Sequence, residues 1–337
     1  MDMTSLLCTL CNSVCIGHLD ETLKIAEQSL GDFNTLKRIY GHSMTAFIKG
    51  KSDRTILLDA HIDEIGFIVT DVDDEGFVKV DCAGGFDIRT LPSHRVIIHG
   101  KEDINAVFTS IPPHLSEGDV QFDDIKKLSL DTGLGATAKE YIKTGDLVTY
   151  DRKACVLANE RVSGKSLDNR AGVAALLYLA DMLKGKCPPV NVCLLFSNQE
   201  ELGCRGAKTA SFEIDCDEAI SIDVSFASFP GIAPDKCGTM GKGPMIGQSP
   251  ILSRKVVSAL ISAAENRNIP YQLETMSGTT STNADAISVS KTGVPTGLVS
   301  VPQRNMHTDA EVVSAEDVVS TAKLLYAYIM AGGATND

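Results

Sequence analysis

The chain has 337 residues, of which 43% are hydrophobic and 22% are charged, and its formal net charge is −13. These proportions are typical of a soluble globular protein of one or two domains, and no apolar run approaches the ~20 residues of a membrane-spanning helix. The negative charge disfavours nucleic acid and anionic membranes as partners. Because the N-terminal segment has no basic signal-peptide region and the ten cysteines are scattered through apolar stretches, we expect a cytoplasmic protein with reduced thiols.

Cys8 and Cys11 form a CxxC pair near the N-terminus. No second pair follows at the spacing of a zinc ribbon, and two cysteines on the apolar face of a helix explain the pattern equally well. We therefore favour a helix over a metal or redox site in this segment.

Up to about residue 65, the sequence predicts a helix followed by strands over "MTAFIKG" (44–50) and "TILLDAH" (55–61). From Gly66, short alternating segments broken by Asp, Gly and Pro indicate β-hairpins that continue through "TGDLVTYD" (144–151). After about residue 160, helical and extended apolar segments alternate, which is typical of an α/β domain with a largely parallel sheet. We therefore expect one α/β domain, of residues 1–65 and 158–337, interrupted by a small β unit of residues 66–157.

Polar side chains recur at one kind of place in the expected α/β domain, directly after an apolar strand. The residues in question are His61 and Asp63, Glu200 and Glu201, Asp223, and His307, while Asp168 lies just before an apolar helix. Because ligands bind outside the carboxyl ends of the strands in open α/β sheets, we expect these side chains to converge.

Two histidines and several carboxylates in one crevice would repel one another unless cations were present. Imidazole and carboxylate ligands suit zinc, cobalt or manganese, and two divalent ions ~3.5–4 Å apart that share a carboxylate would balance the charge. One acid beyond the ligand set would then be free to handle protons. This explains the adjacent Glu200 and Glu201 as one ligand and one base.

Each of these residues also has an ordinary structural explanation. His61 is explained as a core histidine with satisfied hydrogen bonds, and His307 as part of a surface loop. Asp63 is explained as a turn cap, Asp168 as a helix N-cap, and the two glutamates as a helix start. We favour one site because it explains residues at five equivalent places at once.

Five segments carry a specific resemblance: "DAHIDEIGF" (59–67), "SLDNRAG" (166–172), "QEELGCRGA" (199–207), "SIDVS" (221–225) and "NMHTDAE" (305–311). Their order and spacing resemble the glutamyl and deblocking aminopeptidases, the tetrahedral aminopeptidases of the co-catalytic zinc exopeptidase group. The resemblance extends from about residue 5 to 330. It implies an aminopeptidase-type α/β catalytic domain with a mostly parallel central sheet and a PDZ-like β-barrel insertion used in assembly. It also implies dimers that build hollow tetrahedral dodecamers and admit short peptides.

The resemblance further implies two divalent ions per chain, zinc or cobalt, or else manganese, that activate a water for hydrolysis of the N-terminal residue. By resemblance, the first ion is held by His61 and Asp223 and the second by Glu201 and His307. Asp168 would bridge the two ions. The catalytic residues would be Glu200, as general base, and Asp63, which would orient His61.

Three short stretches depart from the family's usual sequence. Val224 is followed by Ser225 and Phe226 where the family often has Thr-His. "NADA" (283–286) stands where Gly-Thr-Asp-Ala is usual, and "RNMH" (304–307) where Arg-Tyr-Met-His is usual. None of these changes removes a predicted ligand or the base. Because we expect them to border the substrate pocket, they bear on which N-terminal residue is preferred.

Three other functions were weighed against this one. An endoglucanase-type glycosidase would use a carboxylate pair, but it leaves His61, Asp223 and His307 unexplained, and the chain has no tryptophan to stack on sugars. A related metal-dependent carboxypeptidase or deacylase would use the same metal site. Activity on peptides with a free N-terminal amine, but not on N-acylated peptides, would distinguish an aminopeptidase from these enzymes. A non-catalytic assembly protein is disfavoured because every catalytic position is filled.

Overall fold

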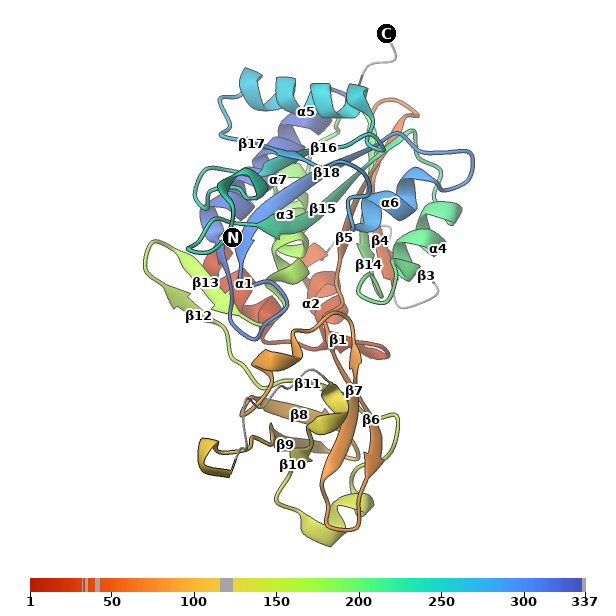
Figure 1. The fold of residues 1–337 in the computed structure, drawn as a ribbon. Coiled ribbons are helices and arrows are strands. Elements are labelled where there is room, and N and C mark those ends of the chain that lie inside the picture. Colours follow the sequence, from red (N-terminus) through yellow and green to blue (C-terminus); the bar gives the residue numbers. More distant parts are fainter. Residues whose placement is uncertain (32, 34–35, 40–42, 116–123, 335–337) are drawn as a thin grey trace.

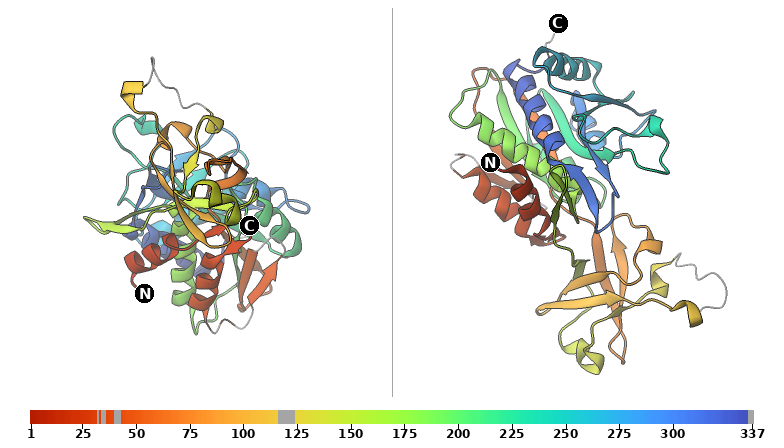
Figure 2. Two further views of the ribbon diagram at one scale, coloured as in Figure 1. Left: turned by 90° about the horizontal axis from the view of Figure 1, so that it is seen from below. Right: turned by 90° about the vertical axis from the view of Figure 1, so that its left-hand side faces the viewer.

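The computed structural model describes residues 1–31, 33, 36–39, 43–115 and 124–334. This part of the chain forms a mixed α/β fold with an eleven-stranded sheet between helices and, beside it, a closed six-stranded barrel (Figure 1). The barrel projects from one end of the larger unit (Figure 2). None of the helices in the described ranges combines the length and the apolarity needed to cross a membrane.

Four parallel strands form the centre of the large sheet. In spatial order they are β18 (Thr296–Arg304), β15 (Glu218–Phe226), β5 (Thr55–His61) and β14 (Asn191–Ser197). Every residue of β5 and β14 is buried. Such continuous burial is typical of parallel strands that are covered by helices on both faces. The parallel order directs the ends of all four strands to one edge of the sheet.

The strands added at the two sides pair with the sheet in antiparallel fashion. On one side lie β4 (Ser43–Ile48) and β3 (Leu36–Ile39), and on the other lie β19 (Glu311–Ser314), β13 (Arg161–Gly164) and β12 (Cys155–Leu157). A further strand, β16 (Met245–Gln248), pairs antiparallel with β18 and parallel with β17 (Gln272–Thr275). The sheet is therefore mixed, and the expectation of a mostly parallel sheet is right only for its centre. Tight connections such as the one between β12 and β13 can join only antiparallel strands, whereas parallel neighbours need a longer crossover.

Helices cover both faces of the large sheet. One face carries α1 (Met3–Cys11), α2 (Glu21–Leu30), α3 (Leu167–Leu183), α5 (Arg254–Asn266) and α7 (Ala315–Met330). The other face carries α4 (Arg205–Glu213) and α6 (Asn283–Ser288). Each helix layer packs on the sheet through its own cluster of buried apolar side chains, so the strand ends are held by two cores.

The CxxC segment lies on helix α1, which confirms the helix expected there from the sequence. Asp2 caps this helix by accepting a hydrogen bond from the Ser5 N–H (3.1 Å). Cys11 faces the core and Cys8 is half-buried, and each of the ten cysteines in the chain is a free thiol. A two-stranded ribbon, β1 (Cys15–Ile16) and β2 (Leu19–Asp20), joins α1 to α2.

The barrel is built from short strands between Gly66 and Tyr150. They are β6 (Gly66–Val72), β7 (Val78–Ala83), β8 (Arg95–His99), β9 (Asp103–Phe108), β10 (Leu130–Asp131) and β11 (Leu147–Tyr150). Alternate side chains point inward and form a separate core, in which Phe67 stacks on Phe86 (centroids 4.4 Å apart) and meets Phe108 edge-on (5.1 Å). Closure leaves the barrel without free strand edges.

Short 3-10 turns complete the described secondary structure, at Ile88–Thr90, Pro113–Leu115, Ile125–Lys127, Gly135–Glu140 and Pro234–Lys236.

Candidate metal centre

The residues predicted to bind metal come together at the carboxyl edge of the parallel strands. His61 is the last residue of β5, Asp223 lies near the end of β15, and Glu201 follows β14. His307 lies in the loop after β18, and Asp168 lies at the start of α3. Side chains from five separate segments therefore share one small region, as the strand-end pattern predicted.

Asp168 lies at the middle of this group. Its Oδ1 is 3.0 Å from His61 Nε2, and its Oδ2 is 3.4 Å from His307 Nε2. The two oxygens of one carboxylate thus face two different imidazole rings.

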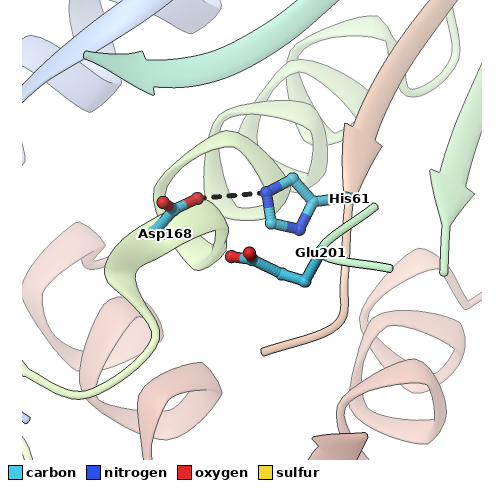
Figure 3. A group of neighbouring side chains, drawn as sticks. All are labelled: His61, Asp168 and Glu201. Atoms are coloured by element: carbon cyan, nitrogen blue, oxygen red, sulfur yellow. Dashed lines mark hydrogen bonds and ion pairs between the residues drawn. The ribbon is translucent and has the colours of Figure 1, made fainter. Parts of the chain in front are cut away.

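On each histidine, the ring nitrogen that faces Asp168 also has a second acidic neighbour. Asp223 Oδ1 is 3.7 Å from His61 Nε2, and Glu201 Oε1 is 3.5 Å from His307 Nε2. The ligand atoms of His61, Asp168 and Glu201 all lie within 4.8 Å of one another. Figure 3 shows these three side chains pointing toward one another. Imidazole and carboxylate donors gathered so closely fit a divalent cation such as zinc, cobalt or manganese.

Burial and like charge dominate the electrostatics of the carboxylates. Burial, reinforced by the charge of Asp168, raises the pKa of Glu201 to about 9. Burial also raises the pKa of Glu200 to about 7, and the charges of Asp223 and Asp63 add to this effect. These acids would be fully ionised at neutral pH in water, so their environment supplies too little positive charge for all of them.

Opposite charges stabilise the ionised forms of His61 and Asp168, which shifts the pKa of each. Burial alone would lower the pKa of His61, but the hydrogen bond to Asp168 and the nearby carboxylates of Asp223 and Asp63 raise it well above its usual value. Burial opposes ionisation of Asp168, yet hydrogen bonds from His307 and His61 hold its pKa below the usual range. A raised pKa favours the charged form of the ring, so a protonated histidine would compensate these carboxylates where a cation is not bound.

Asp63 fixes the turn that carries the glutamate pair. Its Oδ1 accepts the Glu200 N–H (3.0 Å), and its Oδ2 accepts the Glu201 N–H (3.2 Å). Helix α4 begins only at Arg205, so the two glutamates belong to this turn and not to a helix start. His61 Nδ1 lies 3.5 Å from Asp63 Oδ1, longer than a normal hydrogen bond, and the orienting role of Asp63 stays a prediction.

Glu311 is a residue that the sequence analysis missed. Its side chain is buried, and it accepts the backbone N–H of His307 through Oε1 (2.9 Å) and that of Asp168 through Oε2 (3.0 Å). His307 has a left-handed backbone (φ +61°), which is unusual for a residue other than glycine. Glu311 therefore ties together the two segments that face each other across the centre. Its only signal in the sequence is its place at the end of the "NMHTDAE" segment.

A buried ion network, also missed, lies behind the centre. Glu64 forms ion pairs with Lys165 and with Arg170, whose Nη2 is 3.4 Å from Glu64 Oε1. The same carboxylate accepts hydrogen bonds from the Ser166 hydroxyl (2.6 Å) and the Cys15 N–H (3.0 Å). The network joins the segment after β5 to the segment before α3, so it fixes the separation of the backbones that carry His61 and Asp168.

A second buried polar group supports β5. The Asn283 amide donates to Asp59 Oδ2 and to Ser197 Oγ, both at 2.9 Å. Burial raises the pKa of Asp59 to about 7. Asn283 is itself buried and supports β5 through these bonds, while the expectation that this departure from the family's usual sequence borders the substrate pocket stays a prediction. A sequence pattern cannot reveal such a pairing, because the two residues are more than 200 positions apart.

The barrel contacts the loop that carries His307. A Cβ atom built on Gly85 would lie 3.1 Å from His307 Nδ1 and 3.3 Å from Cε1. On the same loop, Asp309 Oδ1 lies 3.3 Å from His94 Nε2 of the barrel. The absence of a side chain at Gly85 therefore lets the barrel pack directly on one ring of the centre.

Comparisons with known proteins agree with this geometry. The family model for the M42 glutamyl aminopeptidases matches residues 42–324. The lysyl aminopeptidase of Pyrococcus furiosus is 30% identical over 294 residues, which cover 85% of this chain and 84% of that protein. A solved aminopeptidase of the archaeon Desulfurococcus kamchatkensis has a TM-score of 0.92 and 31% identity, covering 98% of this chain and 94% of that one. The TET1 peptidase of Pyrococcus horikoshii, described as assembling into a tetrahedron or a large octahedral shell, has a TM-score of 0.85 and 30% identity. The match covers 97% of this chain and 99% of that one. This chain belongs to the M42 glutamyl aminopeptidase family.

Proposed function

We propose that this protein is a metal-dependent aminopeptidase that removes N-terminal residues from short peptides. Its family membership makes it a hydrolase of peptide bonds. The observation that carries the proposal is the position of Asp168, with one carboxylate oxygen toward each of two histidines at the strand ends. That arrangement suits two cations that share one carboxylate.

In this proposal, two divalent ions are bound per chain, zinc or cobalt first and manganese as the alternative. His61 and Asp223 hold one ion, Glu201 and His307 hold the other, and Asp168 bridges them. The 3.7 Å and 3.5 Å separations within the two outer pairs support this division of ligands. The raised pKa of Glu201 is also expected of a buried acid that is ionised only beside a cation.

When bound, the two cations would lower the pKa of the attacking water and polarise the scissile carbonyl. Glu200 takes the proton from that water and passes it to the leaving amine. Two contacts support this role. Asp63 holds the Glu200 backbone in place, and within the described ranges the Glu200 carboxylate accepts just a weak hydrogen bond from the Cys204 thiol (3.5 Å). Burial places the pKa of Glu200 at about 7, which suits a group that both accepts and donates a proton near neutral pH.

We also propose that residues 1–65 and 158–337 form the catalytic domain and that residues 66–157 form a PDZ-like assembly domain. The separate core of the barrel supports this division. Its surface exposes apolar side chains such as Ile68 and Val107, which are available for contacts with other copies. The TET1 peptidase of P. horikoshii assembles into a tetrahedron or a large octahedral shell, and for this chain we propose dimers that build a dodecamer. The ten free thiols support a location in the cytoplasm.

The function is tested with aminoacyl anilides and with their N-acetylated counterparts. We expect the protein loaded with zinc, cobalt or manganese to cleave the anilides that have a free amine and to spare the acetylated ones. A chelator should abolish this activity and added metal should restore it. Cleavage of acetylated substrates alone would favour a deacylase. Chelator-resistant cleavage of a β-glucan would favour the glycosidase.

The glutamate pair is tested by two matched substitutions. Glu200→Gln keeps its shape but cannot accept a proton, so kcat should fall by ~10²–10⁴-fold while metal content stays at the wild-type level. Glu201→Gln replaces an anionic ligand by a neutral one, so the protein should bind less metal and excess metal should restore part of the activity. Metal titration with kcat measured at each point separates the two effects, with the exposed Glu102→Gln as control. If added metal restores the activity of Glu200→Gln but not that of Glu201→Gln, then Glu200 is the metal ligand and Glu201 is the base.

Assembly is tested by light scattering on the purified protein. We expect a particle with twelve times the 36.0 kDa chain mass, or the dimer from which that particle is built. Exposed apolar residues on the barrel would be covered in such a particle. An active protein that stays monomeric at every concentration would contradict the assembly role of the barrel.

A further inference from the structure

A cavity of about 460 Å³ opens between the end of β15, which also carries Asp223, and strand β17. Its walls include Phe226, Met245, Leu273 and Met276, which are apolar. Glu274 also lines the cavity, and it is the acidic residue that lies deepest there.

Glu274 connects this cavity to the metal centre through one hydrogen bond. The Ser225 hydroxyl donates to Glu274 Oε1, and Ser225 lies two residues after Asp223 on β15. Residues two apart on a strand point to the same face and are ~6.6 Å apart along it. Through Ser225, the Glu274 carboxylate therefore reaches the face of β15 that carries the predicted metal ligand Asp223. The charge of Asp223 reaches Glu274 and, together with burial, raises its pKa.

The Glu274 carboxylate lacks a cationic partner in the described part of the chain. Its Oε2 is buried and has no hydrogen-bond partner of normal geometry there. A buried carboxylate is costly unless a cation or several donors compensate it. The other charged residues of the cavity, Asp235 and Lys236, are exposed at its rim and carry opposite charges. Glu274 thus leaves the cavity with a net negative charge at its inner end.

We infer that this cavity receives the side chain of the substrate's N-terminal residue and that Glu274 selects a cationic side chain, lysine or arginine. The apolar walls contact the aliphatic stem of such a side chain, while its charged end pairs with the carboxylate. The inference rests on the proposed aminopeptidase function, because that function places the first residue of a peptide next to the metal centre. Glu274 is then a specificity-determining residue that takes no part in the proton transfers.

The test compares kcat/KM for lysyl, arginyl, leucyl and glutamyl anilides in the metal-loaded wild type, in Glu274→Gln, and in the control Glu265→Gln. Wild type should prefer the two basic substrates. Glu274→Gln should lose ~10-fold or more on these and less than ~3-fold on the leucyl substrate, mainly through KM, because one partner of a buried charge pair is removed. Its metal content should equal that of wild type. Glu265→Gln changes an exposed glutamate on α5 and should alter none of these values.

Competitive inhibition by free L-lysine and free L-leucine gives a second readout, because these amino acids bind the cavity without being cleaved. Inhibition by L-lysine should weaken in Glu274→Gln, whereas inhibition by L-leucine should not. A wild-type preference for leucyl or glutamyl substrates, or an equal loss on all four substrates, would overturn the role of Glu274 and leave the aminopeptidase function standing. Failure of the metal-loaded wild type to cleave any of the anilides would overturn both.

Discussion

Crowding of negative charge at one edge of the sheet is the constraint on which the rest of the structure depends. Asp168 and Asp223 lie beside His61, Asp168 and Glu201 lie beside His307, and Glu200 is close enough to feel the charges of Asp223 and Asp168. Burial and mutual repulsion raise the pKa of Glu201 to about 9, so the protein holds these acids together at a cost in free energy. Divalent cations, as proposed above, would remove that cost and would explain why the fold keeps so many carboxylates in one buried place.

The scaffold resists this repulsion by fixing the backbone on every side of the centre. Asp63 binds two successive N–H groups of the glutamate turn, and Glu311 binds the N–H groups of Asp168 and His307. These bonds hold the main chain, which leaves the functional side chains free to reorganise around a ligand. Behind them, the ion pairs of Glu64 lock two segments of the catalytic unit together. Loss of one partner from such a buried network typically costs 3–5 kcal/mol, so we regard the network as a support for the site.

The site also joins the two structural units of the chain. Gly85 of the barrel lies against the His307 ring, and His94 faces Asp309 on the same loop. Glu311 thus holds the His307 backbone from the sheet side, and the His307 ring lies against Gly85 on the barrel side. Contacts made by the barrel with other copies would therefore act close to the position of His307.

The sequence predicted the members of the centre because strand ends are visible as boundaries between apolar runs and polar residues. It did not predict Glu311, Glu64 or the Asp59–Asn283 pair, because buried polar partners are defined by contacts between distant segments. Periodicity indicated strands but not their order, so the antiparallel strands at both sides of the sheet were not foreseen. The glutamate pair precedes its helix by several residues, and only the contact with Asp63 distinguishes that turn from a helix start.

The central claim is that the Asp168 carboxylate is shared by two cations. The most direct measurement is anomalous diffraction from crystals of the protein grown with zinc or manganese, with data collected on both sides of the metal's absorption edge. We expect two anomalous peaks per chain, ~3.5–4 Å apart, with one Asp168 oxygen beside each peak. A single peak, or peaks that do not contact Asp168, would contradict it.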